Sequence, residues 1–116
     1  MFIESYPDEL ELLSFFESEP TFFDKTDRRF AYEFTDDNGI HLVFSFSVIE
    51  GWIQTVLEIN GNKIAGYLSE GVKSFKVKDE INGEYIHSEI MFADTRTEVE
   101  IRLKPFISVK WGTLVR

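Results

Sequence analysis

The stretch RFAYEFTDDNGIHLVFSFSV, residues 29–48, decides the fold. Apolar side chains occupy every second position on both sides of Asn38-Gly39, which is the period of a β-strand with one buried face. Asn-Gly between two such runs is a strong hairpin signal. A three-residue loop ending at Gly39 sets Phe34 opposite Leu42 and keeps apolar residues together, whereas a two-residue turn mixes apolar with polar positions. We therefore predict the three-residue loop, with Gly39 in the left-handed conformation.

Three more hairpins are predicted downstream. Asn-Gly recurs at 60–61 and 82–83, and we expect a two-residue turn with positive φ at both central residues in each case. A loop at 104–106 closes the last hairpin, with its proline inside the turn. The expected cross-strand pairs are Leu57–Ile64, Ile53–Leu68, Glu58–Lys63, Phe75–Ile90, Lys76–Glu89, Ile101–Val109 and Val99–Trp111.

A helix is predicted before the strands, over about residues 8–19. Pro7 and the acidic residues after it suit the first turn, because a helix N-terminus tolerates proline and attracts negative charge. Leu12, Leu13 and Phe16 share one face of this helix and are expected to pack on the core.

The sequence thus predicts one domain, residues 1–116, of the α+β class and mainly β. Its N-terminal helix is followed by a meander of about eight antiparallel strands, which form a curved sheet, a half-barrel or a sandwich. Aromatic residues make up 16 % of the chain, enough to fill a substantial core. Phe22 and Phe23 stand outside the pattern, and they either plug the end of a sheet or mark an interface.

Negative charge is concentrated near the N-terminus. The net charge is −9, and residues 1–24 carry seven acids and no base. The phosphate groups of nucleic acids and anionic membranes attract lysine and arginine and repel acids. We therefore expect neither a nucleic acid nor a membrane as partner. A basic protein partner would be attracted by this field, although solubility alone also explains it. The candidate partner-binding residues are Asp8, Glu11 and Glu19 on the helix, and Asp36 and Asp37 at the first hairpin tip.

No catalytic pattern, cofactor motif or metal site is predicted. There is no cysteine, and the two histidines, His41 and His87, lack metal-ligand spacing even with Glu33 or Glu89 nearby. The glycines are scattered, so no phosphate-binding loop is present. We therefore expect no enzymatic activity. The absence of cysteine and of a basic, apolar leader predicts a cytoplasmic protein.

In organisation the sequence resembles the small immunity proteins of bacterial toxin–immunity systems, such as polymorphic toxins and contact-dependent inhibition. The resemblance spans the whole chain and lies in the acidic opening ESYPDELELLSFFESEP (4–20) and the alternating strands IHLVFSFSV (40–48) and WIQTVLEING (52–61). It implies tight occlusion of a cognate toxin domain, often a basic nuclease, by charge complementarity. These proteins share no diagnostic motif, so the resemblance assigns no residue a role.

Two alternatives remain open at this stage. The aromatic residues could line a cavity inside a curved sheet, which would make the chain a small-ligand binder. A structural or assembly protein is the third possibility. A hollow larger than about 300 Å³ inside the sheet would favour the ligand binder.

Overall fold

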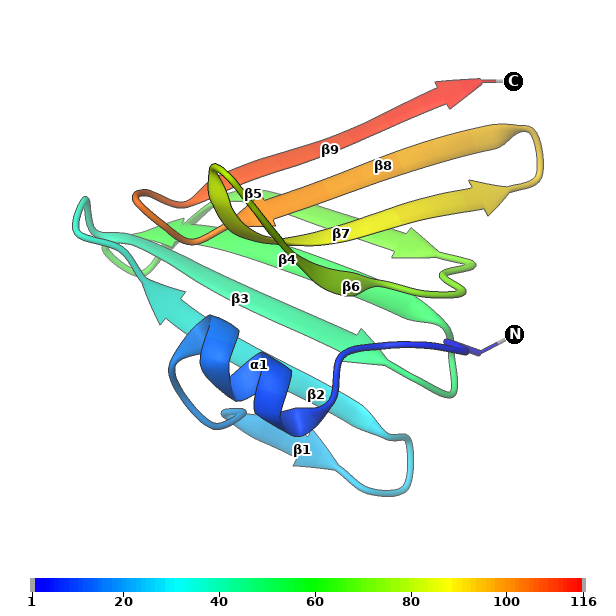
Figure 1. The fold of residues 1–116 in the computed structure, drawn as a ribbon, viewed down its shortest axis with the longest axis horizontal. Coiled ribbons are helices and arrows are strands. Elements are labelled where there is room, and N and C mark those ends of the chain that lie inside the picture. Colours follow the sequence, from blue (N-terminus) through cyan, green and yellow to red (C-terminus); the bar gives the residue numbers. More distant parts are fainter. Residues whose placement is uncertain (1, 116) are drawn as a thin grey trace.

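The computed structural model describes residues 2–115. In them the chain forms one helix and nine strands, and no helix is long and apolar enough to cross a membrane. The elements, drawn in Figure 1, are α1 (Glu9–Phe16), β1 (Phe22–Asp24), β2 (Arg29–Thr35), β3 (Ile40–Ser47), β4 (Trp52–Ile59), β5 (Asn62–Glu70), β6 (Lys76–Glu80), β7 (Gly83–Phe92), β8 (Thr95–Arg102) and β9 (Ser108–Val115).

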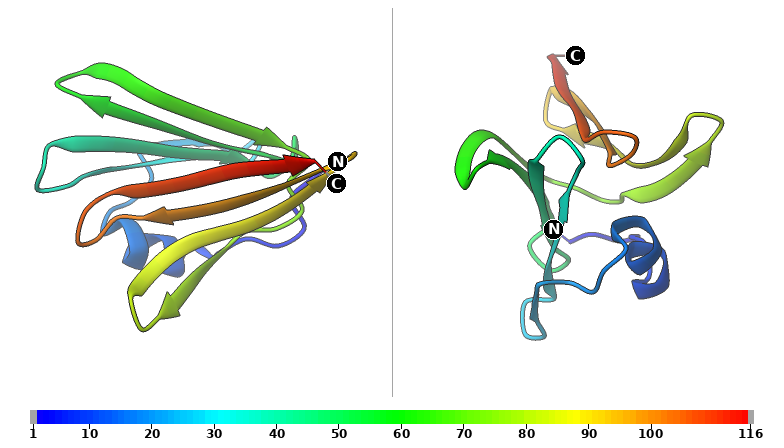
Figure 2. Two further views of the ribbon diagram at one scale, coloured as in Figure 1. Left: turned by 90° about the horizontal axis from the view of Figure 1, so that it is seen from above. Right: turned by 90° about the vertical axis from the view of Figure 1, so that its left-hand side faces the viewer.

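The strands form two open antiparallel sheets, in the orders β1-β2-β3-β4-β5 and β6-β7-β8-β9. Helix α1 contacts both β2 and β6. It therefore lies beside the second sheet, and the two together cover one face of the first sheet (Figure 2). At the other side of the molecule the Trp111 ring stacks on Tyr67, with ring centroids 5.5 Å apart, and its Nε1 donates a 2.9 Å hydrogen bond to Ser69. The mainly β prediction is confirmed, and neither sheet closes into a barrel.

Strand β1 was absent from the prediction of about eight strands. It has three residues, too few to show an alternating pattern. Its pairing with β2 sets Phe23 opposite Phe30, and the two rings stack with centroids 4.7 Å apart. The Phe22–Phe23 pair therefore extends the edge of the first sheet, with both side chains about half exposed.

Two of the four hairpins have the predicted register. Strands β2 and β3 pair Phe34 with Leu42, and Gly39 has a φ of 82° in the three-residue loop. Strands β8 and β9 pair Val99 with Trp111. In both hairpins the alternation of apolar residues determines which face each side chain takes, and the loop length then selects the register.

The β4–β5 hairpin has the predicted turn but not the predicted register. Its turn is the expected Asn60-Gly61, with φ of 52° and 78°, and Glu58 lies opposite Lys63. A β-bulge follows, so Leu57 pairs with Ala65 instead of Ile64. One extra residue on one strand reverses the faces beyond it, so Ile64 and Leu68, expected in the core, are exposed. The inward positions go to Ala65, Tyr67 and Ser69, and the last two contact Trp111.

The register predicted for strands β6 and β7 was also wrong. Glu80 pairs with Gly83, so the turn residues are Ile81 and Asn82, and Gly83 has a φ of 103°. Lys76 consequently lies opposite His87 rather than Glu89, and Phe75 is not opposite Ile90. A shift of two positions keeps every side chain on its face, so the apolar pattern could not distinguish the two registers.

Aromatic side chains fill the space between the two sheets. Phe44, Phe46 and Phe75 are at most 1 % exposed, and their ring centroids lie 4.9–5.9 Å apart in tilted and edge-to-face contacts. Ile86, Val99 and others from the second sheet belong to the same buried cluster. The phenylalanines therefore pack against one another as core residues, which removes the main support for a ligand cavity inside the sheets.

Replacing Gly61 by valine is expected to destabilise the fold by roughly 1 kcal/mol or more, because a β-branched residue resists a φ near 78°. A Cβ at this position would meet no atom within 4 Å, so backbone strain alone sets the cost. Gly112→Val is the matched control, since its Cβ also has open space and its φ is ordinary. Urea unfolding of both variants measures the difference, and equal stabilities would contradict the role of Gly61.

Candidate functional site

The acidic N-terminal region folds into α1 through a capping box. The Asp8 carboxylate accepts a 2.8 Å hydrogen bond from the backbone N–H of Glu11, and the Glu11 carboxylate accepts a 3.2 Å bond from that of Asp8. These bonds satisfy two N–H groups that the helix leaves free. The helix ends at Phe16 because the backbone of Glu17 adopts the left-handed conformation, with a φ of 60°. It is therefore shorter than the predicted 8–19.

Helix α1 packs on the core through Leu12, Phe15 and Phe16, which are at most 5 % exposed. Phe16 stacks on Tyr32, with ring centroids 4.8 Å apart. The expectation that Leu13 faces the core was wrong, since its side chain is 38 % exposed. The helix contacts β2 and β6 together, and this places Phe15 rather than Leu13 inside. Leu13 and the neighbouring Leu10 are left at the surface.

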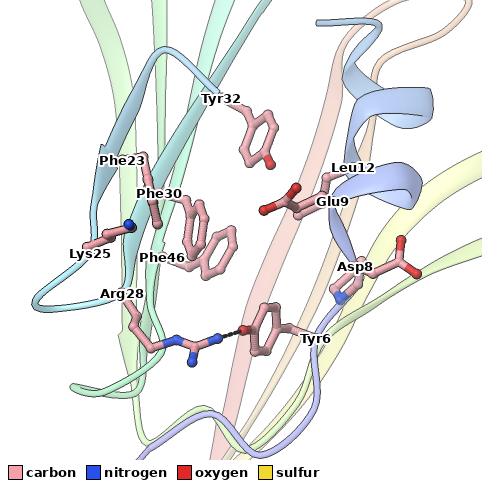
Figure 3. Close-up of a pocket in the computed structure, with 11 residues that line it drawn as sticks. Tyr6, Asp8, Glu9, Leu12, Phe23, Lys25, Arg28, Phe30, Tyr32 and Phe46 are labelled. Atoms are coloured by element: carbon pink, nitrogen blue, oxygen red, sulfur yellow. Dashed lines mark hydrogen bonds between the residues drawn. The ribbon is translucent and has the colours of Figure 1, made fainter. Parts of the chain in front are cut away.

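Two adjoining cavities lie between α1 and strands β1 and β2, with volumes of about 440 and 300 Å³. They share Glu9 from the helix and three aromatic residues, Phe23, Phe30 and Tyr32, from the strands. Figure 3 shows the larger cavity, with Tyr6 and the helix on one side and the β1–β2 hairpin on the other. Both cavities thus have an aromatic wall facing an acidic helix.

The two cavities differ in charge. The larger is lined by two acids and two bases, Asp8, Glu9, Lys25 and Arg28, and Arg28 donates a hydrogen bond to the Tyr6 hydroxyl. The smaller is lined by Glu9 and Glu19 with no base, together with Leu10, Leu13, Ser18, Pro20, Phe23, Phe30 and Tyr32. The smaller cavity is therefore acidic and apolar at once.

The pKa of Tyr32 reflects the burial and the negative charge of this region. Its side chain is 1 % exposed, and burial, reinforced by the charges of Glu9 and Glu19, raises its pKa to about 12. The hydroxyl therefore stays protonated at any physiological pH. Figure 3 shows it directed towards the Glu9 carboxylate.

The five predicted partner-binding residues fall into different environments. Asp8 and Glu11 are exposed but bind each other's backbone in the capping box. Glu19 lines the smaller cavity, and Asp37 is exposed at the β2–β3 tip. Asp37 also lines a third cavity with Glu17, which bridges to Lys104 at 2.7 Å. The first hairpin tip thus lies beside the end of the helix, although the two were predicted as separate clusters.

Asp36 is not the exposed acid that the sequence predicted, since its side chain is buried. Its carboxylate accepts three backbone hydrogen bonds of 2.9 Å, from Asn38, Ile40 and Ile107. Burial on its own would raise the pKa of this carboxyl, but the three donors together lower it below its ordinary value. Asp36 therefore ties the first hairpin tip to the β8–β9 loop.

The two histidines lie on different sheets. His41 in β3 contacts Glu33 and Thr35 at 2.7 Å each, and hydrogen bonds from Thr21 and His41 lower the pKa of Glu33. His87 in β7 has a lowered pKa because of burial and the nearby Lys78. Residues 2–115 contain no cluster of three His, Cys, Asp or Glu side chains able to hold a metal ion.

Of the residues that line the two cavities, only Asp8 and Glu19 were among the predicted site residues. Glu9, Phe23 and Tyr32 were not. In the sequence, Glu9 is one of the acids that suit the first helical turn, and Tyr32 is one of the alternating positions of residues 29–48. Two signals in the sequence pointed to this region, namely the acids of residues 1–24 and the Phe22–Phe23 pair. The role of the Phe22–Phe23 pair is seen only in the structure, which places β1 beside the helix.

Comparison with known proteins gives one close structural match. No protein-family model and no curated protein matches this sequence. A chain of the solved contact-dependent growth inhibition toxin–immunity protein complex from Klebsiella pneumoniae 342 is 41 % identical, with a TM-score of 0.94. The match covers 98 % of this chain and 100 % of that one. The similarity spans both sheets and the helix, and the chain belongs to the immunity proteins of contact-dependent growth inhibition toxin–immunity systems.

Proposed function

We propose that this chain neutralises a cognate bacterial toxin by binding the toxin domain and covering its surface. The full-length similarity to a chain of a toxin–immunity protein complex carries this proposal. The proposal assigns no chemical step to the chain itself, which would act by occupying its partner. It also includes action in the cytoplasm, where proteins without disulfides are common.

We further propose that the partner presents a basic surface to the region around α1. This region holds most of the net charge, since residues 1–24 contribute −7 of −9. Exposed apolar side chains accompany the acids, namely Leu10, Leu13 and Phe23 at 75 %, 38 % and 49 % exposure. Interfaces combine such apolar anchors with a charged rim. Of the five predicted residues, Glu19 and Asp37 are the ones best placed to meet a partner.

The direct test uses a toxin domain encoded by the neighbouring gene. We expect co-expression of the chain to restore growth of cells that produce the toxin domain, and the two purified proteins to elute as one complex. Growth inhibition that persists, with no complex between folded proteins, would overturn the proposed function.

Reversing two free carboxylates is expected to slow the association. Glu19→Lys with Asp37→Lys should reduce the association rate about tenfold at low salt and flatten its dependence on ionic strength, because steering acts through the summed field. Asp8 and Glu11 are unsuitable targets, since changing them breaks the helix cap.

The matched control is Glu4→Lys with Glu70→Lys, which changes the net charge equally. Both residues are exposed, and Glu70 pairs with Trp52 at the end of the first sheet away from Asp37. Stopped-flow association against ionic strength compares the two variants. Equal slowing in both would show that net charge, and not this surface, steers the partner.

A further inference from the structure

The cavity of about 300 Å³ between α1, the segment after it and strands β1 and β2 combines negative charge with an apolar lining. Glu9 enters from the helix and Glu19 from the segment that leads into β1. Leu10, Leu13 and Phe23 form its exposed rim. The cavity therefore places apolar side chains beside two exposed acids, Glu9 and Glu19.

Within residues 2–115 the chain supplies no partner for these carboxylates. Neither Glu9 nor Glu19 forms an ion pair or a side-chain hydrogen bond there, whereas Glu17 between them pairs with Lys104. Two bases, Lys25 and Arg28, line the adjoining cavity, and Arg28 donates a hydrogen bond to Tyr6. The smaller cavity is thus lined by two acids and no base, although Glu9 also lines the cavity that holds Lys25 and Arg28.

The Tyr32 hydroxyl is a second and independent indication of a ligand. Its side chain is 1 % exposed and lines the cavity, yet no group in residues 2–115 forms a hydrogen bond with the hydroxyl. The hydroxyl oxygen is not fully enclosed by protein, so a group that enters the cavity can reach it. The hydroxyl has two free lone pairs and accepts readily from an N–H donor.

We propose that this cavity receives an arginine side chain of the toxin, with its guanidinium between Glu9, Glu19 and the Tyr32 hydroxyl. This inference rests on the proposed function and specifies its contact. An arginine stem has three methylene groups to bury against Leu13 and Phe23. Its planar head stacks on aromatic rings and donates five hydrogen bonds in fixed directions.

Arginine fits this site better than lysine. A lysine ammonium is strongly hydrated and loses more on entering an apolar passage, while a guanidinium is weakly hydrated. Phe23, Phe30 and Tyr32 also line the cavity, and a weakly hydrated planar cation packs beside aromatic side chains more readily than an ammonium does. The same protein already uses this contact elsewhere, since the guanidinium of Arg102 lies over the Tyr85 ring at 4.5 Å.

The chemistry of the cavity can be tested without the toxin. Nα-acetyl-arginine amide is titrated into the isotope-labelled protein, and amide shifts are followed by NMR. We expect saturable shifts of Glu9, Leu13, Glu19 and Phe23 at millimolar probe, with at least threefold weaker binding of the lysine amide and none of the uncharged citrulline amide. Equal shifts with citrulline, or none with arginine, would overturn the proposal.

Two variants tie the binding to the named groups. Glu9→Gln with Glu19→Gln is expected to abolish arginine binding, and Tyr32→Phe to weaken it a few-fold. Glu4→Gln with Glu70→Gln removes the same charge outside the cavity and should bind arginine as the wild type does. Equal binding by the two double variants would contradict the site. Thermal unfolding of each protein confirms that it is folded.

Binding of the toxin domain separates this inference from the proposed function. We expect Glu9→Gln with Glu19→Gln to weaken the complex by about tenfold to a hundredfold, and the control pair to change it less than threefold. A folded variant that binds the toxin as tightly as wild type would overturn the arginine contact and leave the function intact. Failure of the wild type to bind the toxin would overturn the proposed function. The arginine titration would still show whether the cavity binds an arginine side chain.

Discussion

Asp36→Asn is expected to lower the free energy of unfolding by about 2–3 kcal/mol, because a buried donor loses its acceptor. In the structure Oδ1 accepts from the N–H groups of Asn38 and Ile40, and Oδ2 accepts from that of Ile107. An asparagine keeps only one oxygen, so its NH₂ group must face a backbone N–H. We expect the hydrogen bond from Ile107 to break first, and this bond joins the first hairpin tip to the β8–β9 loop.

Asp37→Asn provides the matched control for this change. Asp37 is the next residue and is exposed, and its replacement removes the same charge. We expect it to alter stability by less than about 0.5 kcal/mol, as surface substitutions usually do. Urea unfolding of both variants makes the comparison, and equal losses would show that charge at the tip matters rather than the three bonds.

The effect of Asp36 should also depend on pH. Its pKa is lowered in the folded protein, below the ordinary value of 3.8, so the folded state binds a proton less readily than the unfolded state. The stabilisation is therefore complete above the ordinary value and is lost as the pH falls through the folded pKa. The stability gap between wild type and Asp36→Asn should be wide at neutral pH and should narrow below about pH 3.8. A gap that stays constant down to strongly acidic pH would contradict this account.

The local pattern and the loop length together were enough to predict the strand pairs of two hairpins. The pairing of Phe34 with Leu42 and of Val99 with Trp111 follows from alternation and loop length. The bulge between Leu57 and Glu58 could not be predicted in this way, because it places Tyr67 and Ser69 against Trp111 of a strand distant in the sequence. The Asn82-Gly83 register failed for another reason, since a two-residue slip leaves the faces unchanged.

The candidate site was predictable only in part. Its charge was visible in the sequence, because the acids of residues 1–24 stand without a base. Its shape was not, because the cavities arise where β1 and the helix meet, and β1 is too short to be read from alternation. Asp36 was wrongly predicted as a site residue, because an acid in a turn is usually exposed. Its carboxylate instead accepts hydrogen bonds from three backbone N–H groups.

Phe16→Ala is expected to destabilise the protein by about 3–5 kcal/mol, as large-to-small changes of buried aromatic residues do. The Phe16 side chain is 1 % exposed, and its ring centroid lies 4.8 Å from that of Tyr32 and 6.0 Å from that of Phe44. These stacked rings join α1 to the first sheet. Removing the Phe16 ring should therefore loosen the helix and move Glu9 away from the aromatic wall.

Leu13→Ala on the same helix separates stability from binding. Leu13 is 38 % exposed and lies at the rim of the acidic cavity, so its truncation should cost no more than about 1 kcal/mol. We expect Leu13→Ala to keep its unfolding transition and bind the toxin more weakly, and Phe16→Ala to show an early transition. Unfolding curves and toxin affinities of both variants test this. If Leu13→Ala binds like wild type while Phe16→Ala, still folded, does not, the helix serves only to hold the sheets and the partner lies elsewhere.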